Sequence, residues 1–208
     1  MFLNNIIEVF LFVNPLGRTC YESEKLVEAF SAERDEKVKV RFVPILNIRS
    51  IGNLVKGNYD SSLSSRNHLY TDSYNASLAF QAASMQGRKK GRKFLMKLQQ
   101  SVIKDGSAVT RELMLQIAEA LNLDIEMFEE DLESELSRTA FNKDQKLALE
   151  MGVTESPSCV VYSSKDTTSG YRIDSSITKQ LLHGLCNDQA EKNDQAVTHL
   201  SFSLYQTV

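Results

Sequence analysis

The sequence has few cysteines, and no two of them stand close together. Cys20, Cys159 and Cys186 are scattered along 208 residues. Three scattered cysteines are too few for a disulfide framework and leave one thiol over, so we expect reduced thiols in a reducing compartment. The chain also has no C-x-x-C, H-x-x-x-H, P-loop or G-x-G-x-x-G motif. Metal, nucleotide and dinucleotide binding therefore lack support, and we expect no metal site and no cofactor.

Long apolar runs and a strong excess of one charge are also missing. The first apolar run, Ile6–Val13, is far shorter than the roughly 20 residues of a membrane span. No basic segment precedes it and no small-residue cleavage site follows it. The net charge of −3 gives no general reason to expect nucleic acid or an acidic membrane as a partner. The hydrophobic content of 42% is typical of a globular protein. Because neither a leader nor a membrane span is indicated, we expect the protein in the cytoplasm.

The N-terminal part alternates between strand and helix patterns. Ile6–Val13 and Val38–Ile45 are rich in Val, Ile and Phe and have the length of strands. Tyr21–Glu36, between them, has apolar residues at helical spacing. It carries Glu22 and Glu24 in its expected first turn, where the helix dipole favours acids. A connection of this length favours a parallel strand pair with a right-handed crossover.

The middle of the chain reads as helical. Residues 47–65 are rich in Asn, Gly and Ser, which predicts a long irregular loop. No proline occurs between Arg66 and Met151, and apolar residues recur there at intervals of three and four. Expected breaks at Gly87 and Gly91, at 104–107 and at 122–124 predict about four helices.

The strand pattern returns in the C-terminal part. Cys159–Tyr162 and Tyr171–Ile173 are expected strands, and the polar residues between them resemble a hairpin connection. A final helix is expected over 176–186. The pattern does not place residues 187–208.

This order of elements resembles the thioredoxin fold with an inserted helical domain, as in DsbA-like proteins. Val153–Ser158 (VTESPS) resembles the "gv-x-x-[TS]-P" loop of that superfamily, in which the proline is cis and faces the redox motif. The resemblance implies an α/β fold. Its domain limits would be thioredoxin-like halves at 1–65 and 152–186, a helical insertion at 66–151 and a tail at 187–208.

A second stretch narrows the resemblance to one group. Phe12–Cys20 (FVNPLGRTC) is similar to the "F-x-[DN]-P-L-C-x-x-C" motif of the SpxH (YjbH) group, except that Gly17 replaces the first cysteine. That group consists of cytoplasmic adaptors that bind the stress regulator Spx and promote its degradation by the ClpXP protease. The resemblance therefore implies a protein partner of the Spx type and, indirectly, ClpXP.

Gly17 puts redox chemistry in doubt. In a C-x-x-C site the first cysteine attacks a disulfide and the second resolves the mixed disulfide. Only the second position, Cys20, is filled here, so we assign no catalytic residue and keep Cys20 as a candidate thiol. Cys20 is either a small apolar residue packed at a helix start or a functional thiol. The alternatives to an adaptor are a DsbA-family thiol-disulfide oxidoreductase or isomerase working through Cys20, and a glutathione-dependent transferase.

Four residues are candidates for binding the partner: Gly17, Cys20, Ser156 and Pro157. In the related fold the backbone before the cis proline pairs with a bound extended chain, which needs no cysteine. Cys159 reads as a core residue, since free cysteine is often buried. Cys186 has only His183 nearby in sequence, which is half a metal site at most.

Two charged runs are the last notable feature. Arg88–Lys93 is strongly basic, and residues 124–135 are strongly acidic. Such runs are either solvated faces or partner contacts that act by electrostatic steering. Nucleic-acid binding would call for aromatic residues around the basic run, and Phe94 stands alone there.

Overall fold

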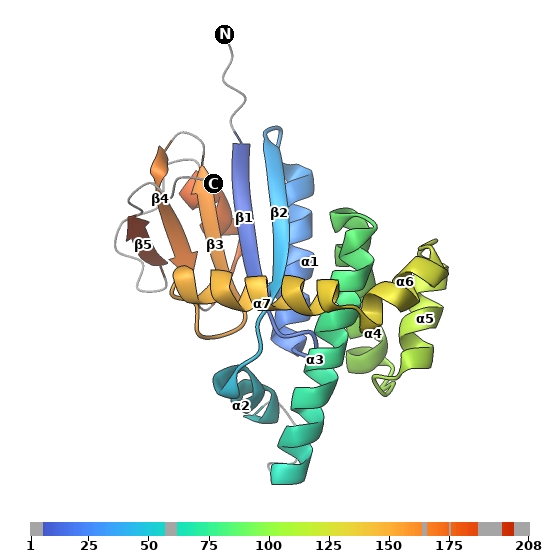
Figure 1. Ribbon diagram of the computed structural model, residues 1–208. Coiled ribbons are helices and arrows are strands. Elements are labelled where there is room, and N and C mark those ends of the chain that lie inside the picture. Colours follow the sequence, from blue (N-terminus) through green and yellow to red (C-terminus); the bar gives the residue numbers. More distant parts are fainter. Residues whose placement is uncertain (1–5, 57–61, 164–165, 175, 187–196, 202–208) are drawn as a thin grey trace. The chain divides into compact units, whose positions relative to one another are not determined.

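The computed structural model describes residues 6–56, 62–163, 166–174, 176–186 and 197–201 (Figure 1). Contacts between residues divide the chain into two compact units. The first unit consists of Met1–Phe12, Glu22–Val43 and Pro157–Val208, and the second of Val13–Tyr21 and Pro44–Ser156. Each unit therefore draws on segments far apart in the sequence. The domain limits expected at 65, 151 and 186 stay a prediction.

A five-stranded sheet forms the centre of the first unit, with the strand order β2-β1-β3-β4-β5. The strands are β1 (Ile6–Val13), β2 (Lys37–Pro44), β3 (Ser158–Ser163), β4 (Asp166–Ile173) and β5 (Val197–Ser201). β3 pairs antiparallel with β1, and β4 and β5 continue the antiparallel arrangement. β5 lies within the tail that the sequence pattern could not place.

β1 and β2 end at the same edge of the sheet. The amide of Ile45, just after β2, donates a hydrogen bond of 2.8 Å to the carbonyl of Val13, the last residue of β1. This arrangement is the one that the predicted parallel pair requires. In β1, buried residues alternate with half-buried ones up to Phe10 and then run uninterrupted to Val13.

Two helices contact each other within the first unit: α8 (Lys179–Cys186), and α1 (Arg18–Glu33) through its residues from Glu22 onward. The ring centroids of Phe30 and His183 lie 4.9 Å apart, and Lys179 pairs with Glu33. Phe30, Leu182 and Leu185 are buried, so both helices contribute to the core of this unit.

The bounds of α1 and α8 correct the sequence prediction. α1 begins at Arg18 rather than Tyr21, because the carbonyl of Gly17 already accepts the first helical hydrogen bond. Glu22 and Glu24 therefore lie beyond the first turn. α8 begins at Lys179 rather than at residue 176. Thr178 caps this start, because its hydroxyl accepts a hydrogen bond from the amide of Leu181.

The polar stretch before Tyr171 also differs from the prediction. It belongs to β4, which runs from Asp166 to Ile173, and is not a separate connection. Gly170 lies within β4, where a Cβ would come 2.6 Å from the ring of Tyr162, so the position requires glycine. The ladder between β3 and β4 is irregular between Val161 and Ser163.

The second unit is helical. Its helices are α2 (Ile48–Lys56), α3 (Leu63–Met85), α4 (Arg88–Lys104), α5 (Arg111–Ala120), α6 (Ile125–Glu133) and α7 (Glu135–Glu150). α3 packs against α2, α4, α6 and α7. The largest side chains of this core include Phe94, Leu98 and Phe128, all without solvent exposure. No helix within the described ranges has the length and apolar character needed to cross a bilayer.

Three helix predictions for this unit were wrong. Residues 48–56 form α2 instead of loop, because Asn47 and Ser50 cap the helix: the Asn47 side chain accepts from the amide of Ser50 at 2.8 Å. Gly91 lies inside α4 and does not break it. Five helices rather than about four begin between 63 and 135, since Ser134 alone both ends α6 and caps α7.

Candidate functional site

Hydrogen bonds around Asn14 close the turn between β1 and α1. Its carbonyl accepts from the amide of Gly17 at 2.9 Å, and its Oδ1 accepts from the amide of Leu16 at 2.9 Å. The hydroxyl of Ser73, on α3, donates to the same Oδ1 at 3.3 Å. Asn14 is only 1% exposed. The turn is therefore fixed from within and tied to the helical core.

Cys20 lies in the first turn of α1 with its sulfur directed inward. The amide of Asn14 donates a hydrogen bond to Cys20 Sγ at 3.3 Å, and Cys20 is 2% exposed. A Cβ at Gly17 would come 2.8 Å from that Sγ and 3.2 Å from the Cβ of Cys20. The missing side chain at position 17 thus leaves the space that the sulfur occupies. A cysteine there would require the side chain of Cys20 to move.

A pocket of about 230 Å³ opens beside this turn. Its walls come from the turn, α2, the end of α4 and the loop after α7. They comprise Asn14, Leu16, Gly17, Arg18, Thr19, Cys20, Ser50, Asn53, Leu54, Val102, Ile103 and Ser156. The pocket therefore gathers Gly17, Cys20 and Ser156 from the predicted binding residues. Pro157 belongs to the first unit, and its part in binding stays a prediction.

α2 holds the loop that carries Ser156. The side-chain amide of Asn47 donates to the carbonyl of Thr154 at 3.0 Å. Arg49 donates to the hydroxyl of Thr154 at 3.3 Å and lies 3.8 Å from the carboxylate of Glu155. The helix that the sequence pattern missed is therefore the element that positions this wall.

The end of α4 forms the opposite wall. The guanidinium of Arg18 donates to the carbonyl of Ile103 at 3.4 Å, and the ammonium of Lys104 lies 5.8 Å from the ring centroid of Tyr21. These residues join the start of α1 to α4. No motif marks Asn53, Val102 or Ile103, so sequence reasoning missed them. The alternation of apolar and polar residues at helical spacing is the only sequence signal that could have indicated that they line a pocket.

The pocket offers one thiol and a mixed polar and apolar surface. Cys159 and Cys186 lie in the first unit and are buried, with Cys159 at 0% exposure. Burial raises the pKa of the Cys159 thiol, and the neighbouring Cys186 adds to this shift. Cys159 therefore stays protonated and unreactive. The part of the chain described here contains no group of three or more residues suited to hold a metal ion.

Sequence comparison relates this chain to known proteins. The sequence profile of the thioredoxin family matches residues 10–183. A ClpXP adapter protein SpxH from Bacillus cereus is 30% identical over 187 residues, which are 80% of this chain and 63% of the relative. The chain thus spans less than two thirds of the length of that relative.

Solved structures share the fold at low sequence identity. A solved structure from Nitrosomonas europaea, described as a candidate protein disulfide isomerase, has a TM-score of 0.66 at 13% identity, covering 86% of this chain and 95% of that one. The oxidoreductase DsbA from Xylella fastidiosa has a TM-score of 0.54 at 14% identity, covering 74% and 72%. These similarities confirm the predicted thioredoxin-like, DsbA-like α/β fold, and the curated relative confirms the resemblance to the SpxH group.

Proposed function

This chain belongs to the thioredoxin family, and we propose that it acts in the cytoplasm as a protein-binding adaptor that promotes degradation of the regulator Spx by the ClpXP protease. The single observation that carries this proposal is the similarity of this chain to the ClpXP adapter protein SpxH from Bacillus cereus. Such an adaptor needs no cofactor. It raises the effective concentration of one protein at another, which requires binding surfaces and no chemistry.

The geometry of the pocket supports binding over thiol chemistry. A thiolate that attacks a disulfide forms a mixed disulfide and releases one thiolate, and a second thiol must then resolve the product. Gly17 supplies no such thiol. The sulfur of Cys20 is buried and accepts a hydrogen bond from Asn14. A pocket of this kind is suited to hold a side chain or an extended segment of a partner without covalent attachment.

Degradation of purified Spx by ClpXP, with and without this chain, tests the proposal. We expect the chain to accelerate the loss of Spx. Asn53→Trp places a large side chain at the exposed rim of the pocket and should weaken the acceleration by about tenfold, or about 1.4 kcal/mol of binding. Lys56→Trp is the matched control, because Lys56 is exposed on the same helix but does not line the pocket.

Cys20→Ser distinguishes an adaptor that does not need the thiol from an enzyme that works through it. Serine keeps the approximate size of cysteine without its nucleophilicity, so an adaptor should retain its effect on Spx in this variant. If the wild-type chain leaves Spx degradation unchanged, the assigned partner is wrong. If Asn53→Trp and Lys56→Trp behave alike, the pocket is not the binding site.

A thiol-disulfide oxidoreductase working through Cys20 is the second candidate. It is favoured by the place of Cys20 in the first turn of α1, where a helix N-terminus stabilises a thiolate. Such an enzyme would reduce or isomerise a disulfide substrate in the presence of excess external thiol, which would resolve the mixed disulfide. Turnover that Cys20→Ser abolishes would favour this candidate over the adaptor.

A further inference from the structure

α4 has an unusual charge composition. It carries seven basic residues and no acidic residue between Arg88 and Lys104. Four of them, Lys89, Lys93, Lys97 and Lys104, recur at intervals that bring them within about 80° of one another around the helix axis. All four are exposed. Lys89, Lys93 and Lys97 follow one another about one turn apart, and Lys104 lies about two turns further along; the four are called here the lysine stripe.

The lysine stripe is not neutralised by ion pairs with the acidic side chains that the structure describes. Within the described ranges no carboxylate forms an ion pair with Lys89, Lys93 or Lys97. The first turn of α4 contains basic residues and no acidic one, and its N-cap, Gly87, offers no side-chain hydrogen bond. Positive charge at a helix N-terminus is unfavourable because it opposes the helix dipole. An anionic partner would relieve this repulsion.

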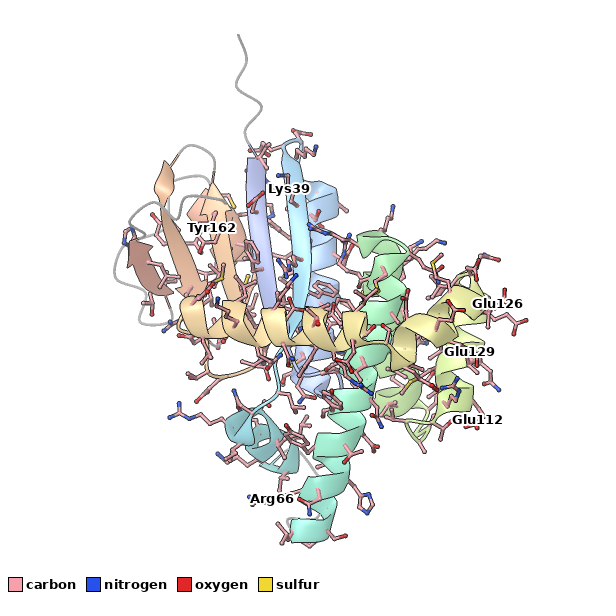
Figure 2. The ribbon with its side chains drawn as sticks, in the orientation of Figure 1. Lys39, Arg66, Glu112, Glu126, Glu129 and Tyr162 are labelled. Atoms are coloured by element: carbon pink, nitrogen blue, oxygen red, sulfur yellow. The ribbon has the colours of Figure 1, made fainter. Side chains whose placement is uncertain are left out.

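The surroundings of the stripe disfavour nucleic acid and membrane as that partner. Phe94, the aromatic residue of α4, has no solvent exposure and cannot stack on a base. Residues 111–138 of the same unit carry nine acidic and two basic residues, which would repel a phosphate backbone that extends beyond the stripe more than a short acidic helix that ends within it. Glu112, Glu126 and Glu129 mark this acidic region in Figure 2. The apolar face of α4 is buried and cannot enter a bilayer.

We propose that the lysine stripe of α4 is a docking surface for an acidic helical segment of a partner protein. Successive lysines from Lys89 to Lys97 are about 6 Å apart along the axis, which matches carboxylates spaced four residues apart on a second helix. At its far end Lys104 lies over Tyr21, and the adjacent Ile103 lines the pocket beside Cys20. The stripe therefore leads to the proposed binding pocket. The inference rests on the proposed function only in taking the partner to be a protein.

Fluorescence anisotropy with a labelled peptide tests the stripe directly. The probe is an alanine-based helix of about 18 residues with glutamate at every fourth position. The stripe variant combines Lys89→Gln, Lys93→Gln and Lys97→Gln, and leaves Lys104 intact because it contacts Tyr21. We expect this variant to bind the probe at least about tenfold more weakly than the wild-type chain.

A matched control removes the same charge elsewhere. Arg66→Gln, Lys143→Gln and Lys146→Gln neutralise three exposed cations on α3 and α7, and binding should stay within about twofold of wild type. Equal losses in both variants would overturn the proposal, as would equal binding of a peptide with the same composition but glutamates on all faces. Tighter stripe-dependent binding of a short single-stranded oligonucleotide, or of vesicles containing phosphatidylglycerol, would also overturn it.

The degradation assay distinguishes this inference from the proposed function. If the stripe variant accelerates Spx loss as well as wild type does, the stripe is not used by that partner and the inference fails while the adaptor function stands. If the wild-type chain does not affect Spx but binds the probe through the stripe, the proposed function fails. The stripe then stands as a docking surface for an acidic helical segment of a different protein.

Discussion

α4 and α6 contribute alike to the core of the helical unit but differ at their N-termini. Phe94 on α4 and Phe128 on α6 are both fully buried, and their ring centroids lie 5.3 Å apart. α6 is capped by Asp124, whose carboxylate accepts from the amide of Met127 at 3.0 Å, and it has an acid in its first turn. α4 has Gly87 as its N-cap, without a side-chain hydrogen bond, and a basic first turn. Packing therefore holds both helices, while the uncapped, basic N-terminus of α4 costs stability, as the proposed docking role would allow.

The shared core gives the largest expected effect. Phe94→Ala and Phe128→Ala should each lower the free energy of unfolding by about 3–5 kcal/mol, because each removes a buried ring and leaves a cavity. Denaturant unfolding followed by circular dichroism measures this change. Met127→Ala, at a half-exposed position of α6, is the control and should stay within about 0.5 kcal/mol. Clearly unequal losses for the two phenylalanines would break the equivalence of the two helices.

Gly91 gives a second large effect within the basic run itself. A Cβ there would come 2.0 Å from the hydroxyl oxygen of Ser84 and 2.9 Å from its Cα, so α3 and α4 touch at this point. Gly91→Ala should destabilise by about 1–3 kcal/mol through overpacking, which outweighs the gain of about 1 kcal/mol from alanine's helix propensity.

Gly52 on α2 is the matched control for that substitution. A Cβ at Gly52 meets no atom within 4 Å. Gly52→Ala should therefore show only the helix-propensity gain, about 0.5–1 kcal/mol. Thermal or denaturant unfolding of both variants decides the matter, and a stabilised Gly91→Ala protein would refute the close contact between α3 and α4.

Gly91 also shows where sequence reasoning about the fold reaches its limit. A glycine in a helical pattern predicts a break, but Gly91 instead permits a close contact between two helices that only the folded chain brings together. Ser134 separates α6 from α7 without any Gly or Pro signal. By contrast, β1 was predicted with its observed bounds, because Ile6–Val13 has strong strand composition and one or both faces buried.

The candidate site likewise combines residues that sequence motifs indicate with features that only the folded structure reveals. Short motifs surround Gly17, Cys20 and Ser156, and the structure places all three in the lining of one pocket. Their role in binding stays a prediction. The hydrogen bond from Asn14 to the sulfur of Cys20 could not be predicted, since it depends on the exact geometry of the turn. Asn53 and Ile103 reach the pocket from helices whose placement only tertiary packing decides.

The N-cap of α6 offers a moderate test of the contrast between the two helices. Asp124→Ala should cost about 1 kcal/mol, because the amide of Met127 loses its acceptor. Asp124→Asn should recover most of this stability, since asparagine caps helices about as well. Glu130→Ala, an exposed control on α6, should have little effect. A harmless Asp124→Ala would mean that α6 gains no more from its cap than α4 does.

The smallest effect is expected at Lys89, and its sign matters more than its size. Lys89 lies in the first turn of α4, so Lys89→Gln should stabilise the free chain by about 0.3–1 kcal/mol by removing a charge that opposes the helix dipole. Lys97→Gln, beyond the first turn, should show no such gain, because the effect of the dipole fades within one turn. Added salt should abolish the difference between the two variants by screening. If Lys89→Gln is instead less stable than wild type, Lys89 stabilises the fold, and α4 does not trade stability for binding at this position.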